Sequence, residues 1–203
     1  MTIAATPNLS RAREVIDLVG NVVDIGVRHL TATGGPDIHQ VLAYDLAHSA
    51  AAIAMARSLL DYGAKGSTEA QLTCAFVADM LHEVSSRLIG RERQWGVSDN
   101  SLRDANDFLA IYRDPEFVAT LASTPGPRHL DDEFEMVQDT FRSFAMKEIA
   151  PRAEHVHRNN EDVPEEIISG LAEIGAFGLS VPAQYGGFSE GGEGEYMASC
   201  IAT

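Results

Sequence analysis

The sequence is poor in cysteine, with two residues, Cys74 and Cys200, among 203. Two thiols make no disulfide framework of the kind that holds small secreted domains together, so we expect a reducing, cytoplasmic environment. Cys74 lies inside a helical pattern and Cys200 near the end of the sequence. We interpret both as small apolar filler.

Basic residues are also scarce, because 15 Lys and Arg stand against 30 Asp and Glu for a net charge of -15. This charge repels polyanions, so nucleic-acid binding would need a local basic stripe. The densest basic cluster, Arg87, Arg91 and Arg93, is interrupted by Glu92. We interpret it as the solvated end of a helix and predict no nucleic-acid partner.

Long apolar runs are missing as well. No segment reaches the roughly 18 uncharged apolar residues of a membrane helix. The first twenty residues lack the basic start and the apolar centre of a secretory signal. We therefore expect no membrane partner and a cytoplasmic location.

Helical periodicity dominates what is present. Apolar residues recur three and four positions apart and almost nowhere alternate as in a half-buried strand, so we predict an all-α fold. The pattern predicts helices over residues 9–30, 37–62, 68–88, 99–112 and 115–122. Gly63 is expected to cap the second helix, and Thr68 with Gln71 has the form of a capping box on the third.

The third helix is expected to present one apolar face. Its members recur every four residues: Leu72, Phe76, Met80, Val84 and Leu88. Residues 123–129, "STPGPRH", then combine two prolines, a glycine and small polar residues, which is typical of a linker. We predict a helical N-terminal extension over residues 1–122, a linker over 123–129 and a second helical region over 130–203.

The second region begins with Asp131, Asp132 and Glu133, which suit the positive end of a helix. An aromatic stripe follows: Phe134, Val137, Phe141, Phe144 and Ile149. A stripe at helical spacing indicates a core, so Phe141 and Phe144 are expected to be buried rather than to form a cofactor platform. Pro151 is expected to kink or end this helix, and Pro164 to open another that Gly175 ends.

None of the patterns tested predicts a site. Five glycines in residues 186–194 are interleaved with glutamates and followed by no lysine, which indicates a surface turn rather than a phosphate cradle. His155 and His157 point about 200° apart on a helix, so no metal set forms. Glu165 and Glu166 diverge by about 100°, too far to act as a carboxylate pair. We name no catalytic, cofactor-binding or metal-binding residue.

Residues 134–187 read "FEMVQDTFRSFAMKEIAPRAEHVHRNNEDVPEEIISGLAEIGAFGLSVPAQYGG". The motifs E-I-A-P, V-P, L-A-E-I-G, G-L-S-V-P and Y-G-G occur there in order. With these motifs the segment resembles the N-terminal helical region of the acyl-CoA dehydrogenase family. In that family the Y-G-G turn links two helices. Residues 1 to about 125 resemble a helical extension carried by some bacterial members.

The resemblance implies oxidation of an acyl-CoA thioester between its α and β carbons, with FAD accepting a hydride and an electron acceptor reoxidising it. The family's β domain and C-terminal bundle would follow Thr203, so no catalytic or flavin-binding residue is transferred. A homo-oligomer is expected. The alternatives are a flavin oxidase or monooxygenase of the same superfamily and a non-enzymatic helical interaction module.

The end of the sequence is expected to begin one more helix near Glu193. Its predicted apolar face holds Tyr196, Met197, Cys200 and Ile201, and no stop signal follows. We therefore expect a chain cut inside an element. As this chain alone it would bind no FAD, oxidise no acyl-CoA and self-associate through its exposed apolar surface.

Overall fold

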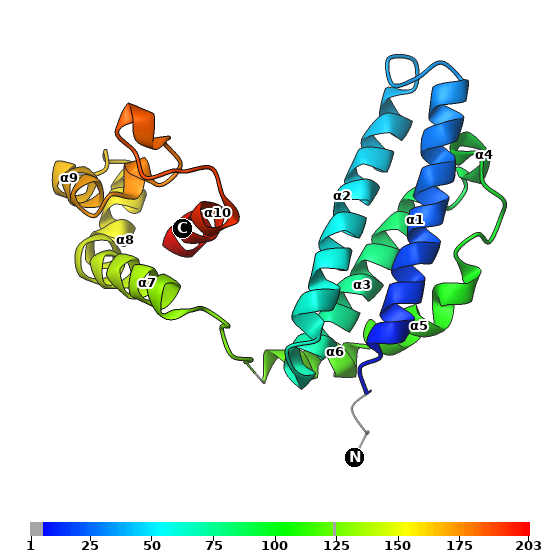
Figure 1. Ribbon diagram of the computed structural model, residues 1–203, viewed down its shortest axis with the longest axis horizontal. Helices are drawn as coiled ribbons and strands as arrows, with labels where there is room; N and C mark the ends of the chain where they lie inside the picture. The colour runs from blue at the N-terminus through cyan, green and yellow to red at the C-terminus, as the bar shows by residue number, and fades with distance from the viewer. Residues whose placement is uncertain (1–5, 124) are drawn as a thin grey trace. The chain divides into compact units, whose positions relative to one another are not determined.

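The computed structural model describes residues 6–123 and 125–203. The chain divides into an N-terminal unit, which runs to Pro127, and a C-terminal unit, Arg128–Thr203. The described residues are helical and contain no strand, and Pro182 and Ser189 form an isolated bridge. The all-α prediction is therefore confirmed, and Figure 1 shows the helices of each unit. No helix in the described part is long and apolar enough to cross a membrane.

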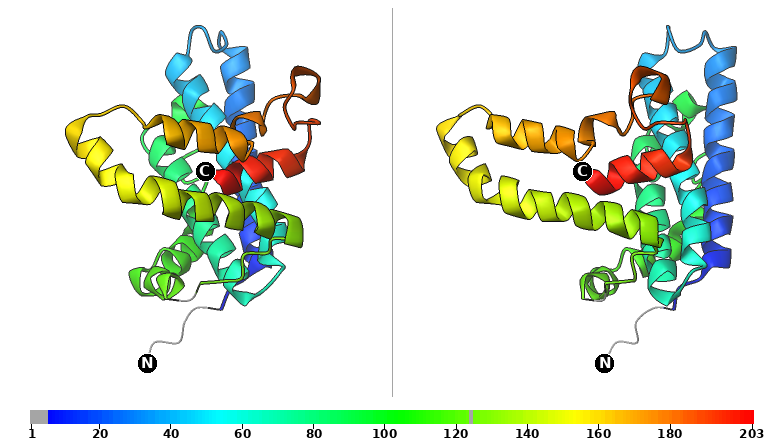
Figure 2. Two further views of the ribbon diagram at one scale, coloured as in Figure 1. Left: turned by 90° about the vertical axis from the view of Figure 1, so that its left-hand side faces the viewer. Right: turned by 60° about the vertical axis from the view of Figure 1, so that its left-hand side comes forward.

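Three long helices form the body of the N-terminal unit: α1 (Leu9–Ala32), α2 (Gln40–Gly63) and α3 (Ser67–Leu88). They run side by side and pack against one another (Figures 1 and 2). Val15, Val19 and Val22 of α1 are buried, as their three- and four-residue spacing predicts. The predicted helices over residues 9–30 and 37–62 are thus confirmed within a few residues at each end.

Short helices close one side of this bundle: α4 (Glu92–Trp95), the 3-10 turn η1 (Arg103–Ala105), α5 (Asn106–Tyr112) and α6 (Pro115–Ala122). Trp95 is completely buried, and the Phe108 and Tyr112 rings contact each other in a tilted arrangement with centroids 4.5 Å apart. The prediction of one helix over residues 99–112 was wrong, because its first part forms turns. Pro115 opens α6 as predicted, and the Asp114 carboxylate accepts hydrogen bonds from the N–H groups of Glu116 and Phe117.

Two predicted helix ends were wrong. Gly63 is the last residue of α2 and is buried, and its cap, Ala64, has right-handed backbone angles. A Cβ on Gly63 would lie 2.7 Å from Thr73 Oγ1, so glycine is needed there for the close approach of α2 and α3. The N-cap of α3 is Gly66, and no side chain caps it, so the Thr68–Gln71 capping box does not form.

The predicted face of α3 was right in part. Met80, Val84 and Leu88 are buried as predicted, whereas Leu72 is exposed and Phe76 only half-buried. A spacing of four residues advances about 400° around a helix, so such a series drifts by about 40° at each step. Leu72 and Leu88 therefore lie on different sides of α3.

The C-terminal unit begins with a long interrupted helix: α7 (Asp132–Phe144), the π-helical turn η2 (Ala145–Ile149) and α8 (Ala150–Asn159). Pro151 lacks an N–H and cannot continue the α-helical hydrogen-bond ladder behind it. The helix nevertheless goes on, because the π turn changes the hydrogen-bond pattern before Pro151. The expected interruption at Pro151 thus takes the form of a π turn in front of it.

The rest of this unit is shorter: α9 (Glu165–Glu173), the 3-10 turns η3 (Ala176–Gly178) and η4 (Ala183–Tyr185), and α10 (Glu193–Ala202). The helices opened by Pro164 and near Glu193 are confirmed. Among the described residues of this unit, Ile167 is the one buried hydrophobic side chain. Phe141 and Phe144 are half-buried, so the prediction that they are core was wrong.

The predicted face of α10 was wrong in part. Tyr196 is 75% exposed and Met197 is 41% exposed, and Cys200 is exposed rather than apolar filler. Ile201 is partly buried, and the half-buried positions next to it include Ala198 and Ser199. α10 packs against α7, and it turns this small-residue side inward.

Candidate functional site

The glycine-rich loop of residues 186–192 is the first candidate, because it resembles a phosphate cradle in composition. Gly186 has a left-handed φ of 85°, and a Cβ on Gly187 would collide with the carbonyl oxygen of Val181. Both glycines of the Y-G-G turn are therefore required by the backbone. The turn is closed by hydrogen bonds from Phe188 N to Gly178 O and from Ser189 N to Val181 O, each 2.9 Å.

The convergent N–H groups of this loop bind a side chain of the chain itself. The Glu195 carboxylate accepts hydrogen bonds from the backbone N–H groups of Glu190, Gly191 and Gly192 and from Ser189 Oγ, which lies 2.6 Å from Oε2. Such a set of N–H groups makes an anion nest. Here the anion is Glu195, and the sequence prediction of a turn without a phosphate is consistent with this geometry.

These hydrogen bonds stabilise the ionised form of the Glu195 carboxylate. The hydrogen bond from Ser189, together with those from the backbone N–H groups, lowers the pKa of Glu195 below its ordinary value of 4.5. The carboxylate is therefore ionised at neutral pH and fixes the start of α10 to the loop. Glu195 is the residue that sequence analysis missed in this loop, although a glutamate three residues after an N-cap was the available signal.

A groove of about 470 Å³ lies between α8 and α9. Its apolar lining includes Ile149, Ala153, Val156, Val163 and Ile167. Arg152 and His157 stand at its polar edge with Glu161. Arg152 and Glu161 each have a partner outside the groove lining. Arg152 Nη1 is 3.4 Å from Glu148 Oε2, and Glu161 Oε1 is 3.3 Å from His155 Nε2. The groove offers an apolar surface without a free acid–base pair.

The acidic and histidine residues considered in the sequence stay apart. Glu165 and Glu166 are both exposed in the first turn of α9. The Asn159 amide donates a hydrogen bond to His155 Nδ1, and His157 is exposed. In the described ranges no three His, Cys, Asp or Glu side chains gather as a metal site would require.

Cys74 and Tyr112 form a buried pair in the N-terminal unit. Burial raises the pKa of the Cys74 thiol, which keeps it protonated and unreactive. Burial also raises the pKa of Tyr112 to about 12. The Tyr112 hydroxyl donates a hydrogen bond of 2.8 Å to the carbonyl oxygen of Thr6. The prediction that Cys74 is a buried structural residue is confirmed, and neither group is poised for catalysis.

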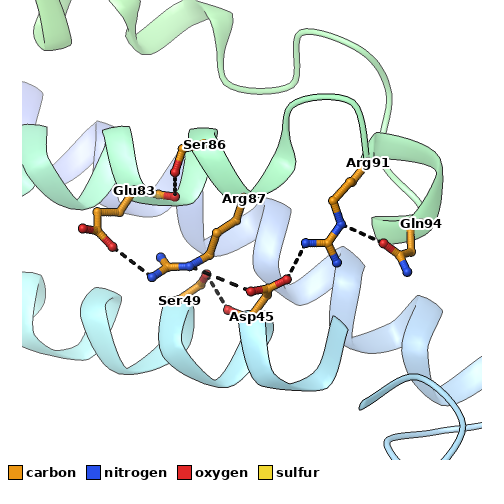
Figure 3. A network of polar contacts seen from close by, with 7 residues as sticks. All are labelled: Asp45, Ser49, Glu83, Ser86, Arg87, Arg91 and Gln94. Atoms are coloured by element: carbon orange, nitrogen blue, oxygen red, sulfur yellow. Dashed lines mark hydrogen bonds and ion pairs between the residues drawn. The ribbon is translucent and has the colours of Figure 1, made fainter. Parts of the chain in front are cut away.

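A polar network between α2 and α3 was not expected from the sequence. Asp45, 9% exposed, binds Arg91 with Nη1 2.6 Å from Oδ2, and Arg87 Nε lies 4.0 Å from its other oxygen (Figure 3). Glu83 and Gln94 bind the outer sides of the two arginines. The interpretation of this cluster as a solvated helix end was therefore wrong in part: Arg87 does lie in the last turn of α3, but Arg87 and Arg91 are only partly exposed and pair with Asp45. They hold α2 to α3 and to the turn before α4, which is a structural role.

Comparison with known proteins finds a similarity that covers the C-terminal unit. Residues 131–203 match the model of the acyl-CoA dehydrogenase N-terminal domain. The chain is 44% identical over 80 residues to (2S)-methylsuccinyl-CoA dehydrogenase of Cereibacter sphaeroides, which is 39% of this chain and 14% of that protein. It is 41% identical over 58 residues to a probable acyl-CoA dehydrogenase of Bacillus subtilis (strain 168), 29% of this chain and 15% of the relative.

A third relative is glutaryl-CoA dehydrogenase of Desulfococcus multivorans, 35% identical over 75 residues, which is 37% of this chain and 19% of that protein. The chain thus spans less than a fifth of the length of these curated relatives. The resemblance seen in residues 134–187 is confirmed, and the family match extends it to Thr203. The match does not include residues 1–130.

Proposed function

We propose that the C-terminal unit is part of the N-terminal helical domain of an FAD-dependent acyl-CoA dehydrogenase. The observation that carries this proposal is the family match over residues 131–203, which coincides with a compact helical unit that starts at Arg128. The Y-G-G turn supports it, because Gly186 and Gly187 are both required by the backbone there. The whole protein is taken to be cytoplasmic, where the free thiols of Cys74 and Cys200 in this chain would stay reduced.

In this proposal the whole protein oxidises an acyl-CoA thioester between the α and β carbons. FAD supplies the redox chemistry, and the protein binds and orients the substrate. Two of the similar proteins are named for methylsuccinyl-CoA and glutaryl-CoA, which are thioesters of dicarboxylic acids. Dicarboxylic acyl-CoA thioesters are therefore the first substrates to test.

The described residues do not fit FAD by themselves. A dinucleotide needs a site for its pyrophosphate, and backbone N–H groups at a helix start commonly provide one. The N–H groups at the start of α10 already hold the Glu195 carboxylate. The groove between α8 and α9 has an apolar lining, and the arginine at its edge is paired with Glu148. We therefore assign no flavin contact to this chain and expect the chain alone to be colourless.

The test has two parts. The whole protein is purified and its flavin absorbance is recorded, and then a panel of acyl-CoA thioesters is added with an artificial electron acceptor. Methylsuccinyl-CoA and glutaryl-CoA are compared with butyryl-CoA as a monocarboxylic control. Reduction of the acceptor with formation of the enoyl-CoA is the expected result.

Other outcomes separate the alternatives. Oxygen consumption with hydrogen peroxide formation, without reduction of the acceptor, would indicate a flavin oxidase instead. A whole protein that carries no flavin would contradict the enzyme proposal and favour a helical interaction module. Stoichiometric flavin on the 203-residue chain alone would overturn the statement that its residues do not fit FAD.

A further inference from the structure

The solvent side of α2 is apolar over most of its length. Val41, Tyr44 and Met55 are 65%, 66% and 54% exposed. From Gln40 to Ala56 no exposed residue of the helix is charged, because its single acidic residue there, Asp45, is buried. A helix that is apolar on all sides is typical of one that other protein surrounds. The outer face of α2 therefore has the character of a contact surface.

Five of the exposed residues of α2 form a seam with alternating spacings of three and four. Its members are Tyr44, Ala47, Ala51, Ala54 and Ser58, all exposed. This is the a/d spacing with which one helix packs along another at a small crossing angle. Small side chains at such positions let two backbones approach closely. This spacing therefore favours another helix as the partner of the seam.

The seam is complementary to itself in an antiparallel pair. If Ala51 of one copy meets Ala51 of another, residues that face each other lie equally far from Ala51 in opposite directions along the sequence. Tyr44 then faces Ser58, His48 faces Ala54 and Met55 faces Ala47, so each of these three large side chains meets a small one. The Tyr44 and His48 rings, with centroids 4.3 Å apart, act as one knob. A parallel pair would instead bring Tyr44 against Tyr44.

Charges at the two ends of α2 favour the same arrangement. Asp37 precedes the helix and Lys65 follows it, and both are exposed. The register that pairs Ala51 with itself also places the start of one α2, which follows Asp37, beside the end of the other, which precedes Lys65, at both ends of the pair. Opposite charges at a rim set register and orientation more than affinity. An isologous two-fold contact uses both pairs at once.

From this seam we infer that two copies of the chain associate through α2, antiparallel, with the two-fold axis beside Ala51. The contact belongs to the N-terminal unit and does not depend on whether the whole protein is a dehydrogenase. It differs from association through the exposed apolar residues of the C-terminal unit, such as Met136 and Met197. The experiments below separate these two surfaces.

The first experiment is sedimentation of the 203-residue chain over a concentration series. Ala51→Glu places two carboxylates against each other at the axis, so the Kd for dimerisation should rise at least about tenfold. Val118→Glu is the matched control, because Val118 is an apolar residue of α6 that is 47% exposed, and it should leave the Kd unchanged. Unaltered Trp95 fluorescence shows that each variant is folded.

The second experiment tests register by cross-linking in a Cys200→Ser background. Ala51→Cys should form a disulfide between copies, because a disulfide needs Cβ atoms within about 4.5 Å. Tyr44→Cys alone should form none, whereas a mixture of Tyr44→Cys and Ser58→Cys chains should cross-link. Cross-linking of Tyr44→Cys with itself would refute the antiparallel arrangement. A monomeric wild-type chain, or a dimer abolished by Met197→Glu but not by Ala51→Glu, would overturn the inference.

Discussion

Aromatic side chains are buried to different extents in the two units. In the N-terminal unit Trp95 and Phe108 are 0% and 1% exposed, whereas in the C-terminal unit Phe141 and Phe144 are half-buried and Tyr196 is 75% exposed. The stripe of α7 has the right spacing for a core, but α10 and α9 cover it incompletely. The spacing of apolar residues predicts which side of a helix turns away from water. Whether that side is fully buried depends on how many other elements pack against it.

The largest expected difference is in resistance to proteolysis. Residues 123–129 lie between α6 and α7 and form no helix in their described part. Cleavage there needs no unfolding, whereas cleavage in α3 requires opening close to the global free energy, about 5 to 15 kcal/mol. Limited proteolysis followed by mass spectrometry should therefore cut first in residues 123–129. Earlier cleavage inside α3 would contradict the prediction that residues 123–129 separate two units.

A core substitution in the N-terminal unit comes next. Phe108→Ala removes a ring that is 1% exposed, and it should lower the free energy of unfolding by about 3 to 5 kcal/mol. Trp95 is the single tryptophan, so its fluorescence in a urea titration reports this unit alone. Ile111→Ala on the same helix, at a residue 45% exposed, is the control and should cost much less.

The network of Asp45 should give an intermediate effect. Asp45→Asn leaves Arg87 and Arg91 without their shared carboxylate, and we expect a loss of about 1 to 3 kcal/mol. The loss is smaller than for a fully buried pair because the two arginine side chains are 26% and 31% exposed. Asp61→Asn, at an exposed position of α2, is the matched control. Equal urea midpoints for the two variants would show that the network adds nothing.

Phe144→Ala tests the same contrast between the units in the C-terminal unit. The ring lies over Gly170, where an added Cβ would come within 2.4 Å of it. Since Phe144 is half-buried, its loss should cost about 1 to 2 kcal/mol, below the range for a buried phenylalanine. Circular dichroism of the thermal transition measures it, and the Trp95 signal should stay unchanged. A cost equal to that of Phe108→Ala would remove the contrast between the units.

The smallest expected effect is the pH dependence of the Glu195 contact. The hydrogen bonds lower the pKa of Glu195 in the folded chain, so the stabilisation is present above the unfolded value of about 4.5 and is lost as pH falls through the folded pKa. The protection of the amides of residues 190–192 from exchange, relative to the intrinsic rate at each pH, should decrease over this acidic range. In Glu195→Gln the exchange should lose this dependence, and an unchanged profile would contradict the assignment.

The sequence by itself determined most of the helices and the resemblance of residues 134–187. These features depend on local chemistry: three- and four-residue spacing, proline at helix starts and glycine in turns. The positions of Pro115 and Pro164 predicted two helix starts that the structure contains. Features with a local cause could be predicted from a single sequence.

Tertiary structure decided which predicted faces are buried and what the polar residues do. Asp45 meets Arg87 and Arg91 only because α2 and α3 pack side by side, more than forty residues apart in the chain. Gly63 is required by Thr73 of the neighbouring helix, and the glycine-rich loop holds Glu195 instead of a phosphate. Leu72 and Phe144 have apolar side chains, but their exposure is set by the surfaces packed beside them. Contacts between distant segments depend on how helices pack together, which local periodicity does not encode.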